Sequence, residues 1–458
     1  MDLLNATRNI LNGIMLVCIM TLAFGGRTLD ALMVMLIGIL CAPLSAIAGQ
    51  SVPFAYFAGA GLLAYALLNA RRLKIPRNNF VLLLSTIIFL LLFLEWLSTV
   101  ICVFAHAPLS VGWLGLLGRL RGILLYGLST VFAYNGLRNH VGVGGNTLFS
   151  KILSALGIAM MLNLVAVCVQ LVHPQYGFRI VSAWYSSESR STIQAMEKTG
   201  MFLRSYGLNY SPVVLGFKSL LSFGGALFHT LMPRNATTDR KAIAVMILSV
   251  VNGALSFSKT FILGFVISIM VYWLYGLLPK LRYSSTVSIN TKRVLVGCCL
   301  LIAFVVVGVS ADKLQRATGL PFSYYFSKMI RSPLDAFASR YQYELLPQNA
   351  KLMYDVIQAH PVFGVGMTSV VGEFVGDSQY LGVIHNGGIV ALFLTLIEIG
   401  LVLYVSWARR LHMFFGLFFA SAIAGFAVPT LSTDLCLCLL GTFAGYVAYS
   451  ESTFLNKS

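Results

Sequence analysis

The chain has 458 residues, of which 58% are hydrophobic and only 10% are charged, against roughly 25% charged residues in an ordinary soluble domain. This composition excludes an intrinsically disordered chain, which needs low hydrophobicity. It also excludes a soluble protein, which could not keep this much apolar surface away from water. In a soluble protein the formal net charge of +17 would indicate a nucleic-acid partner. Basic cytoplasmic loops and arginines that face an anion explain it better here, so we expect an all-α polytopic membrane protein with no nucleic-acid partner.

The apolar stretches are sufficient for about 12–14 transmembrane helices, because one span needs about 20 mostly apolar residues. In chain order the predicted spans cover residues 10–24, 29–48, 51–70, 79–104, 113–135, 152–173, 210–231, 242–257, 260–279, 294–311, 387–407, 413–430 and 434–450. No small-residue cleavage site follows the first stretch, so we expect it to be a span and not a signal peptide. Short or re-entrant segments are the alternative for the first three stretches.

Lysines and arginines gather after the third, seventh, ninth and eleventh predicted spans. The four clusters are Arg71, Arg72, Lys74 and Arg77; Arg234, Arg240 and Lys241; Lys280, Arg282, Lys292 and Arg293; and Arg409 and Arg410. If the spans alternate in direction, all four clusters lie on one side of the membrane, which by the positive-inside rule is the cytoplasm. This arrangement places the C-terminus inside, and it places the N-terminus outside if the number of spans is odd.

The same alternation divides the chain into five parts. These are N-terminal transmembrane helices (1–173), a first outer loop (174–209), central transmembrane helices (210–311), a large outer loop (312–386) and C-terminal transmembrane helices (387–458). The large loop has six basic residues, six acidic residues and six tyrosines. Because a sugar site needs polar groups and aromatic faces, we expect a mostly helical functional cap, with a plain outer domain as the alternative.

Several charged side chains lie inside or beside predicted spans, where a charge costs about 3 kcal/mol or more and needs a reason. Glu95 and Glu398 fall near mid-span, and we expect both to be hydrogen-bonded within the bundle. The cations that converge on the outer face are Arg119, Arg121, Arg204 and Lys259. Since arginine grips phosphate with two parallel hydrogen bonds, this group predicts a site for a lipid-linked phosphate or diphosphate. Snorkelling of each cation to lipid headgroups is the alternative.

Two short patterns stand near the end of the large outer loop. The first is HPVFGVG at residues 360–366, with Arg340 upstream of it. The second is DSQYL at residues 377–381, followed by GGI at 387–389. We expect HPVFGVG to form a structural turn, because proline fixes φ and glycine permits backbone conformations that other residues avoid.

A third pattern opens the seventh predicted span and runs from GMF through Arg204 to SP and LG, within residues 200–216. Together the three patterns resemble the O-antigen polymerase and ligase superfamily of membrane glycosyltransferases, over residues 195–400. SFSKT at 256–260 is a weaker similarity to the superfamily, in which relatives often have arginine in place of Lys259. Each pattern is short, and it is their order along the loop that makes the set moderately specific.

Two branches of the superfamily fit the chain. The register of Asp377 is more similar to Wzy-type O-antigen polymerases. The pair His385-Asn386 resembles the pair that WaaL-type O-antigen ligases carry at the end of the same loop, although Gly387 and Gly388 follow it directly, unlike in ligases. We therefore expect a polymerase, with a ligase as the alternative. A lipid-linked oligosaccharide transporter is a second alternative, disfavoured because the charges gather at the outer face.

The resemblance implies a GT-C-like fold in the bacterial inner (cytoplasmic) membrane, with the active site facing the periplasm. It implies an inverting, metal-independent transfer without a cofactor. A glycan on undecaprenyl diphosphate is passed to a repeat unit on the same kind of carrier. The implied partners are the undecaprenyl-diphosphate-linked oligosaccharide and the lipid bilayer, with a Wzz-type chain-length regulator and a Wzx-type flippase as candidates.

For this reaction the candidate catalytic residues are Arg204, Arg340, Glu373, Asp377 and His385. The two arginines would stabilise negative charge on the leaving diphosphate, and one of the other three would take the proton of the acceptor hydroxyl. The alternatives are an N-cap role for Asp377 and simple hydrogen bonding for His385. The candidate substrate-binding residues are Arg119, Arg121, Lys259, Tyr341, Tyr343 and Tyr380. The tyrosines would stack on sugar rings or, alternatively, pack the cap onto the bundle.

Overall fold

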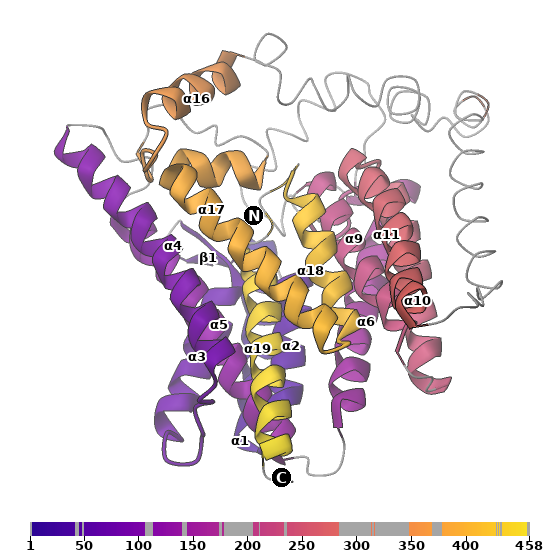
Figure 1. Cartoon of the computed structure of the whole chain (residues 1–458). Coiled ribbons are helices and arrows are strands. Elements are labelled where there is room, and N and C mark those ends of the chain that lie inside the picture. Colours follow the sequence, from indigo (N-terminus) through magenta and orange to yellow (C-terminus); the bar gives the residue numbers. More distant parts are fainter. Residues whose placement is uncertain are drawn as a thin grey trace.

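The computed structural model describes residues 2–41, 45–47, 50–105, 113–139, 144–173, 176–177, 205–209, 211–232, 236–283, 313, 316, 348–368, 378–426, 428, 430 and 433–455. This part of the chain forms helices and one short hairpin. Figure 1 shows the helices gathered in one bundle, with α16 (Gln348–Ala359) at one end and the C-terminus at the other. The helices of the bundle are α1 (Asp2–Phe24), α2 (Thr28–Cys41), α3 (Phe54–Leu68), α4 (Asn79–Phe104), α5 (Trp113–Asn139), α6 (Gly144–Val172), α9 (Pro212–His229), α10 (Ala236–Leu255), α11 (Lys259–Tyr283), α17 (Gln379–Ala408), α18 (His412–Ala424) and α19 (Asp434–Leu455).

Each predicted span except 294–311 overlaps one of these helices, and 294–311 lies outside the described residues. Within the described ranges, five helices are long and apolar enough to cross a membrane, namely α4, α6, α9, α17 and α19. Shorter apolar stretches lie in α1, α2, α3, α11 and α18. The chain is therefore a helical membrane protein, as the composition predicts, and the full number of spans stays a prediction.

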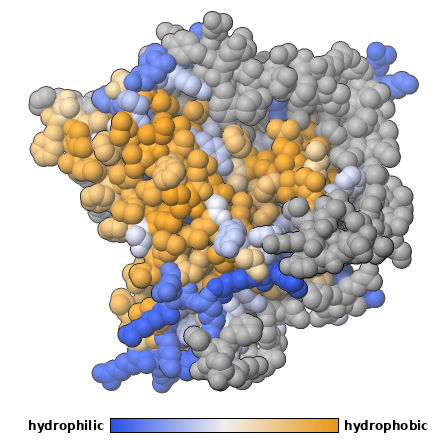
Figure 2. All heavy atoms as spheres, viewed as in Figure 1, coloured by the Kyte–Doolittle hydropathy of each residue, from blue (hydrophilic) through white to orange (hydrophobic). Residues whose placement is uncertain are grey.

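α4 illustrates how the sequence makes these helices. Asn78 caps its N-terminus, because the side-chain oxygen accepts a hydrogen bond from the backbone N–H of Phe80 at 2.7 Å. The 26 residues that follow contain neither glycine nor proline, so nothing interrupts the helix. Its outward face exposes large apolar side chains such as Leu82, Phe89 and Phe93, which suits contact with lipid. Figure 2 shows such apolar residues over much of the visible surface.

α9 lies at the centre of the bundle and packs against α6, α10, α11 and α18. Ser211 caps it and Pro212 occupies its first turn, a position where proline needs no hydrogen-bond donor. Nearly every residue of α9 is buried. A side chain at Gly224 or at Gly416 of α18 would overlap the backbone of the other helix, so these glycines allow the two helices to approach closely.

One predicted boundary is wrong. The span predicted over residues 29–48 is too long, because α2 ends at Cys41. An antiparallel hairpin follows, formed by β1 (Ser45–Ile47) and β2 (Gln50–Val52). Pro43 and Pro53 bracket this segment in the sequence, and proline disfavours helix continuation. The fold is a helical bundle, as predicted, with this one short hairpin added in the described residues. Residues 379–386, which are predicted to end the large outer loop, are helical, and the break at Gly388 separates them from the rest of α17.

The basic clusters that the structure describes lie at one end of the bundle. The Glu451 side chain, near the end of α19, pairs with both Asn78 at the start of α4 and Arg409 after α17. The backbone N–H of Lys74 donates to Asn135 near the end of α5 at 3.0 Å. Figure 1 shows the C-terminus and the α3–α4 turn at this same end, and Figure 2 shows hydrophilic residues there. Its assignment to the cytoplasm by the positive-inside rule stays a prediction.

A buried polar cluster fixes the short segment 205–209, which directly follows Arg204. Lys218 of α9 is only 9% exposed, and its Nζ donates to the Leu40 carbonyl at 2.8 Å and to Asn209 Oδ1 at 2.7 Å. Asn209 Nδ2 in turn donates to Asn163 Oδ1 of α6 at 2.8 Å. A charge this deep is tolerated because backbone and amide oxygens surround the ammonium group. Lys218 thereby links the end of α2, α6 and the 205–209 segment.

We expect Lys218→Met to lower the free energy of unfolding by about 2 kcal/mol, because it leaves buried oxygens without their donor. Unfolding in mixed detergent micelles, followed by circular dichroism, measures this loss. Lys241→Met is the matched control, since Lys241 is exposed and its hydrogen bonds within the described residues go to Ser150 and Ser154. A change within about 0.5 kcal/mol is expected there. Equal losses in the two variants would contradict a structural role for the buried cluster.

Candidate functional site

Three segments meet at the end of the bundle that lies away from the basic clusters: residues 360–368, called the 360–368 turn; the first part of α17; and residues 95–99 of α4. Backbone hydrogen bonds join the turn to α17. Val365 N donates to the His385 carbonyl at 2.8 Å, and Gly366 N donates to the Asn386 carbonyl at 3.0 Å. In the opposite sense, Ile389 N donates to the Pro361 carbonyl at 2.9 Å. The HPVFGVG pattern and the His385-Asn386 pair therefore form one structural unit.

The contact depends on a break in α17 at Gly388. Its backbone has φ 67° and ψ −166°, a region that is essentially restricted to glycine. The break interrupts the helical hydrogen-bond ladder, so the carbonyls of His385 and Asn386 can accept from the turn. Gly364 also has a positive φ, of 64°, and a side chain there would overlap the His385 carbonyl. The expectation that HPVFGVG is a structural turn is confirmed.

α4 holds the turn from its other side. Met367 N donates to Thr99 Oγ1 at 2.9 Å, and Ser98 Oγ donates to the Phe363 carbonyl. Gly366 lies so close to α4 that a side chain would overlap Thr99. The turn is thus clamped between two helices that are far apart in sequence.

Three polar side chains, those of Glu95, Asn386 and His385, form a hydrogen-bonded series where the 360–368 turn meets α4 and α17. Asn386 Nδ2 donates to Glu95 Oε1 at 2.9 Å, and Asn386 Oδ1 lies 2.9 Å from His385 Nδ1. His385 is 5% exposed and Glu95 is half-buried. The expectation that Glu95 is hydrogen-bonded within the bundle is confirmed. Its partner Asn386 is the neighbour of the candidate residue His385, and sequence reasoning did not foresee this bond.

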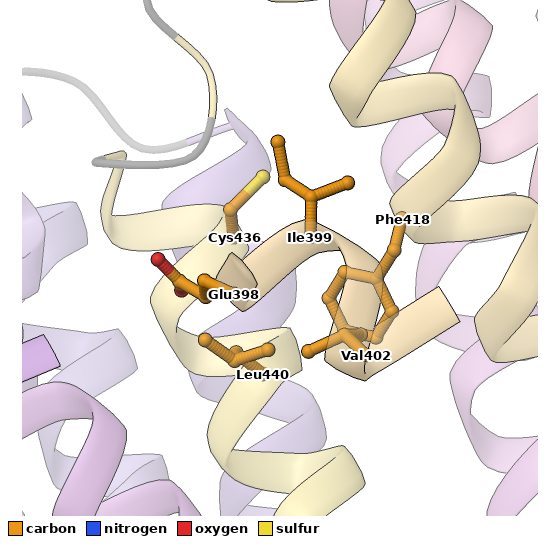
Figure 3. Close-up of a pocket in the computed structure, with 6 residues that line it drawn as sticks. All are labelled: Glu398, Ile399, Val402, Phe418, Cys436 and Leu440. Atoms are coloured by element: carbon orange, nitrogen blue, oxygen red, sulfur yellow. The ribbon is translucent and has the colours of Figure 1, made fainter. Parts of the chain in front are cut away.

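Glu398 behaves differently from Glu95. Its side chain is 7% exposed and lines a small, mostly apolar cavity together with Ile399, Val402, Phe418, Cys436 and Leu440 (Figure 3). Among the residues that the structure describes, no hydrogen-bond donor or cation pairs with its carboxyl group. The expectation of a hydrogen-bonded structural carboxyl is therefore not met within this part of the chain.

Many of the predicted site residues lie outside the described residues, namely Arg204, Arg340, Tyr341, Tyr343, Glu373 and Asp377. Arg119 lies on α5, and its side chain is outside the description as well. Of the remaining predicted residues, only His385 is part of the clamp at the 360–368 turn. The roles assigned to the others stay predictions.

Arg121 and Tyr380 are both engaged in packing contacts. Arg121 Nε pairs with Asp434 Oδ1 at 2.8 Å, and its guanidinium lies 4.2 Å from the ring centre of Tyr56. Tyr380 donates its hydroxyl hydrogen to the Ala422 carbonyl at 2.7 Å, and its ring packs on Phe426. Tyr380 ties α17 to α18, which matches its packing alternative. Arg121 ties α5 to α19 through an ion pair, which differs from the snorkelling given as its alternative.

The end of the third sequence pattern, at the start of α9, also contacts the SFSKT turn at residues 256–260. A side chain at Gly216 of α9 would overlap Ser258, so the SFSKT turn lies directly on the start of α9. In this turn Ser258 N donates to Ser256 Oγ at 3.2 Å, and Phe257 has a positive φ of 47°, which is unusual for a bulky residue. Lys259, half-buried, begins α11.

Sequence reasoning missed Ser98 and Thr99, which hold the 360–368 turn. A signal was present, because Glu95, Ser98 and Thr99 follow the i, i+3, i+4 spacing of one helix face. Polar residues on one face of an otherwise apolar helix indicate a polar contact there.

Comparison with known proteins adds no constraint: neither protein-family models nor curated protein sequences match this chain. Within the described ranges, no three His, Cys, Asp or Glu side chains are grouped so that they could hold a metal ion. The described part of the site contains the carboxyl group of Glu95, the amide of Asn386 and the imidazole of His385.

We expect Gly388→Ala to disrupt the clamp, because a side chain at this φ is strained and would overlap the Val362 carbonyl. The cost is about 3 kcal/mol, and cleavage by a soluble protease within the 360–368 turn should rise at least tenfold. Gly400→Ala is the control on the same helix, since no atom lies within 4 Å of its added side chain. Wild-type cleavage rates in Gly388→Ala would contradict the proposed docking of the turn.

Proposed function

We propose that this chain is a membrane glycosyltransferase of the O-antigen polymerase type. It would transfer a glycan from undecaprenyl diphosphate to a lipid-linked repeat unit. The observation that supports this most is the pairing of the HPVFGVG turn with His385-Asn386. These are two of the places where the sequence resembles the superfamily, and they build one polar site.

The position of the site suits a lipid-linked substrate. Thr99 lies 21 residues after Asn78, which is about 30 Å of helix and about the thickness of a bilayer core. Asn78 belongs to the basic end of the bundle. If that end is cytoplasmic, the His385 site opens near the periplasmic face of the inner membrane, where the carrier lipid would present its diphosphate.

The proposed reaction forms one bond and breaks another at the same carbon. A hydroxyl oxygen of the acceptor sugar attacks the anomeric carbon of the donor, and the bond from that carbon to the lipid diphosphate breaks. The hydroxyl proton passes to Nε2 of His385, and the electron pair leaves with the diphosphate. Arg204 and Arg340 are proposed to stabilise the charge that develops on the diphosphate.

A ligase that moves finished polymer to lipid A core is the second candidate. The same pairing supports it, because His385-Asn386, the pair that resembles ligases, is joined to the turn by backbone hydrogen bonds. Donor and chemistry are the same in the two cases, and only the acceptor differs. A Wzz-type regulator and a Wzx-type flippase remain proposed partners of the polymerase alone.

The surface polysaccharide of a strain that lacks the gene distinguishes these functions on a gel. A single repeat unit on lipid A core, without a ladder, is the result expected for a polymerase. Naked core with polymer left on its carrier would indicate the ligase, and an unchanged ladder would contradict both. Complementation with His385→Ala or Arg340→Ala should not restore the ladder. His412→Gln should restore it, because His412 contacts Tyr275 in another part of the bundle.

A further inference from the structure

The side chains of Glu95, Asn386 and His385 form a hydrogen-bonded series. In this series the donor and acceptor roles in one bond determine those in the next. Asn386 uses both ends of its amide: one lies 2.9 Å from Glu95 Oε1 and the other 2.9 Å from His385 Nδ1. The Nε2 atom of His385 has no hydrogen-bond partner among the described residues. One of the two ring nitrogens is therefore committed and the other is available.

The donor and acceptor roles follow from the chemistry of the groups. An ionised carboxylate can only accept hydrogen bonds, so the amide NH2 of Asn386 must face Glu95. The amide oxygen then faces His385, and because this oxygen can only accept, His385 Nδ1 must carry the hydrogen. A neutral imidazole has a single N–H, so its Nε2 carries a lone pair. We propose that Glu95, acting through Asn386, sets the His385 tautomer in which Nε2 is the proton acceptor.

The surrounding backbone keeps this series in place. The Asn386 carbonyl accepts from Gly366 N, which fixes the position of Asn386 at the break in α17. Glu95 lies one helical turn before Ser98 and Thr99, which bond the 360–368 turn. Rotation of the Asn386 amide would point its NH2 group at His385 and its oxygen at a carboxylate, so the orientation has no acceptable alternative while Glu95 is ionised.

The catalytic meaning of this arrangement rests on the proposed transfer reaction, whereas the tautomer is a property of the free protein. Glu95 and Asn386 are positioning residues, because they act on His385 and not on the substrate. In this tautomer Nε2 carries the lone pair and is the only basic atom of the ring.

Solid-state NMR of the full chain in lipid bilayers, with 15N-labelled histidine rings, tests the tautomer directly. The spectra are recorded at about pH 8.5, where ordinary histidines are neutral. The His385 signals are those absent from His385→Gln. We expect a protonated Nδ1 and an unprotonated Nε2 in the wild type. A protonated Nε2 in the wild type would overturn the inference without any further variant.

Two variants test whether Glu95 and Asn386 are the cause. Asn386→Leu removes the acceptor, so the Nε2-protonated form should become the main one. Glu95→Gln keeps the size of the side chain but can face Asn386 with either end of its amide, so both tautomers should appear. Glu451→Gln, at the opposite end of the bundle, should leave the signals unchanged. An unchanged Nδ1-protonated spectrum in both Asn386→Leu and Glu95→Gln would overturn the proposal.

A rate measurement keeps this inference separate from the proposed function. With a lipid-linked repeat unit as substrate, Asn386→Leu should lower kcat about 100-fold and leave KM nearly unchanged. If the tautomer is as expected but His385→Gln retains full transfer activity, the base assignment fails and the tautomer inference stands. If transfer is lost in His385→Gln but the wild-type tautomer is the opposite one, the positioning role of Glu95 fails.

Discussion

The contact between the 360–368 turn and the break in α17 at Gly388 is the constraint on which the site depends. The break releases the carbonyls of His385 and Asn386 to accept from the turn. It also sets the position from which the Asn386 side chain reaches Glu95. Without a residue that tolerates φ 67° at this point, α17 would run straight and the turn would lose its partner. A single backbone conformation therefore connects the 360–368 turn, α4, α17 and the imidazole of His385.

The rest of the bundle follows the rule that a polar group in an apolar setting needs a partner. Lys218 is surrounded by oxygens from α2 and the 205–209 segment, and Arg121 is paired with Asp434. Each of these pairings ties together helices that are distant in sequence. The polar residues that a hydropathy analysis treats as exceptions thus determine how the apolar helices are arranged. Glu398, facing its small apolar cavity, has no such pairing within the described residues.

Hydropathy predicts the helices well, because the need to satisfy every backbone group in lipid leaves few other structures. It fails between α2 and α3, where Pro43 and Pro53 disfavour a continuous helix and a hairpin lies inside an apolar stretch. The local pattern HPVFGVG correctly predicts a turn, since its glycines have positive φ. The bond from Asn386 to Glu95 joins residues 291 positions apart, and that from Arg121 to Asp434 joins residues 313 apart. Such pairings depend on tertiary packing, so no local rule could have supplied them.

A cryo-electron microscopy map of the full chain in a lipid nanodisc, at a resolution that shows side chains, tests the central claim most directly. The account predicts density for the 360–368 turn against α17, with Asn386 between Glu95 and His385. A continuous, unbroken helix through Gly388, or a turn that lies away from α4 and α17, would contradict it.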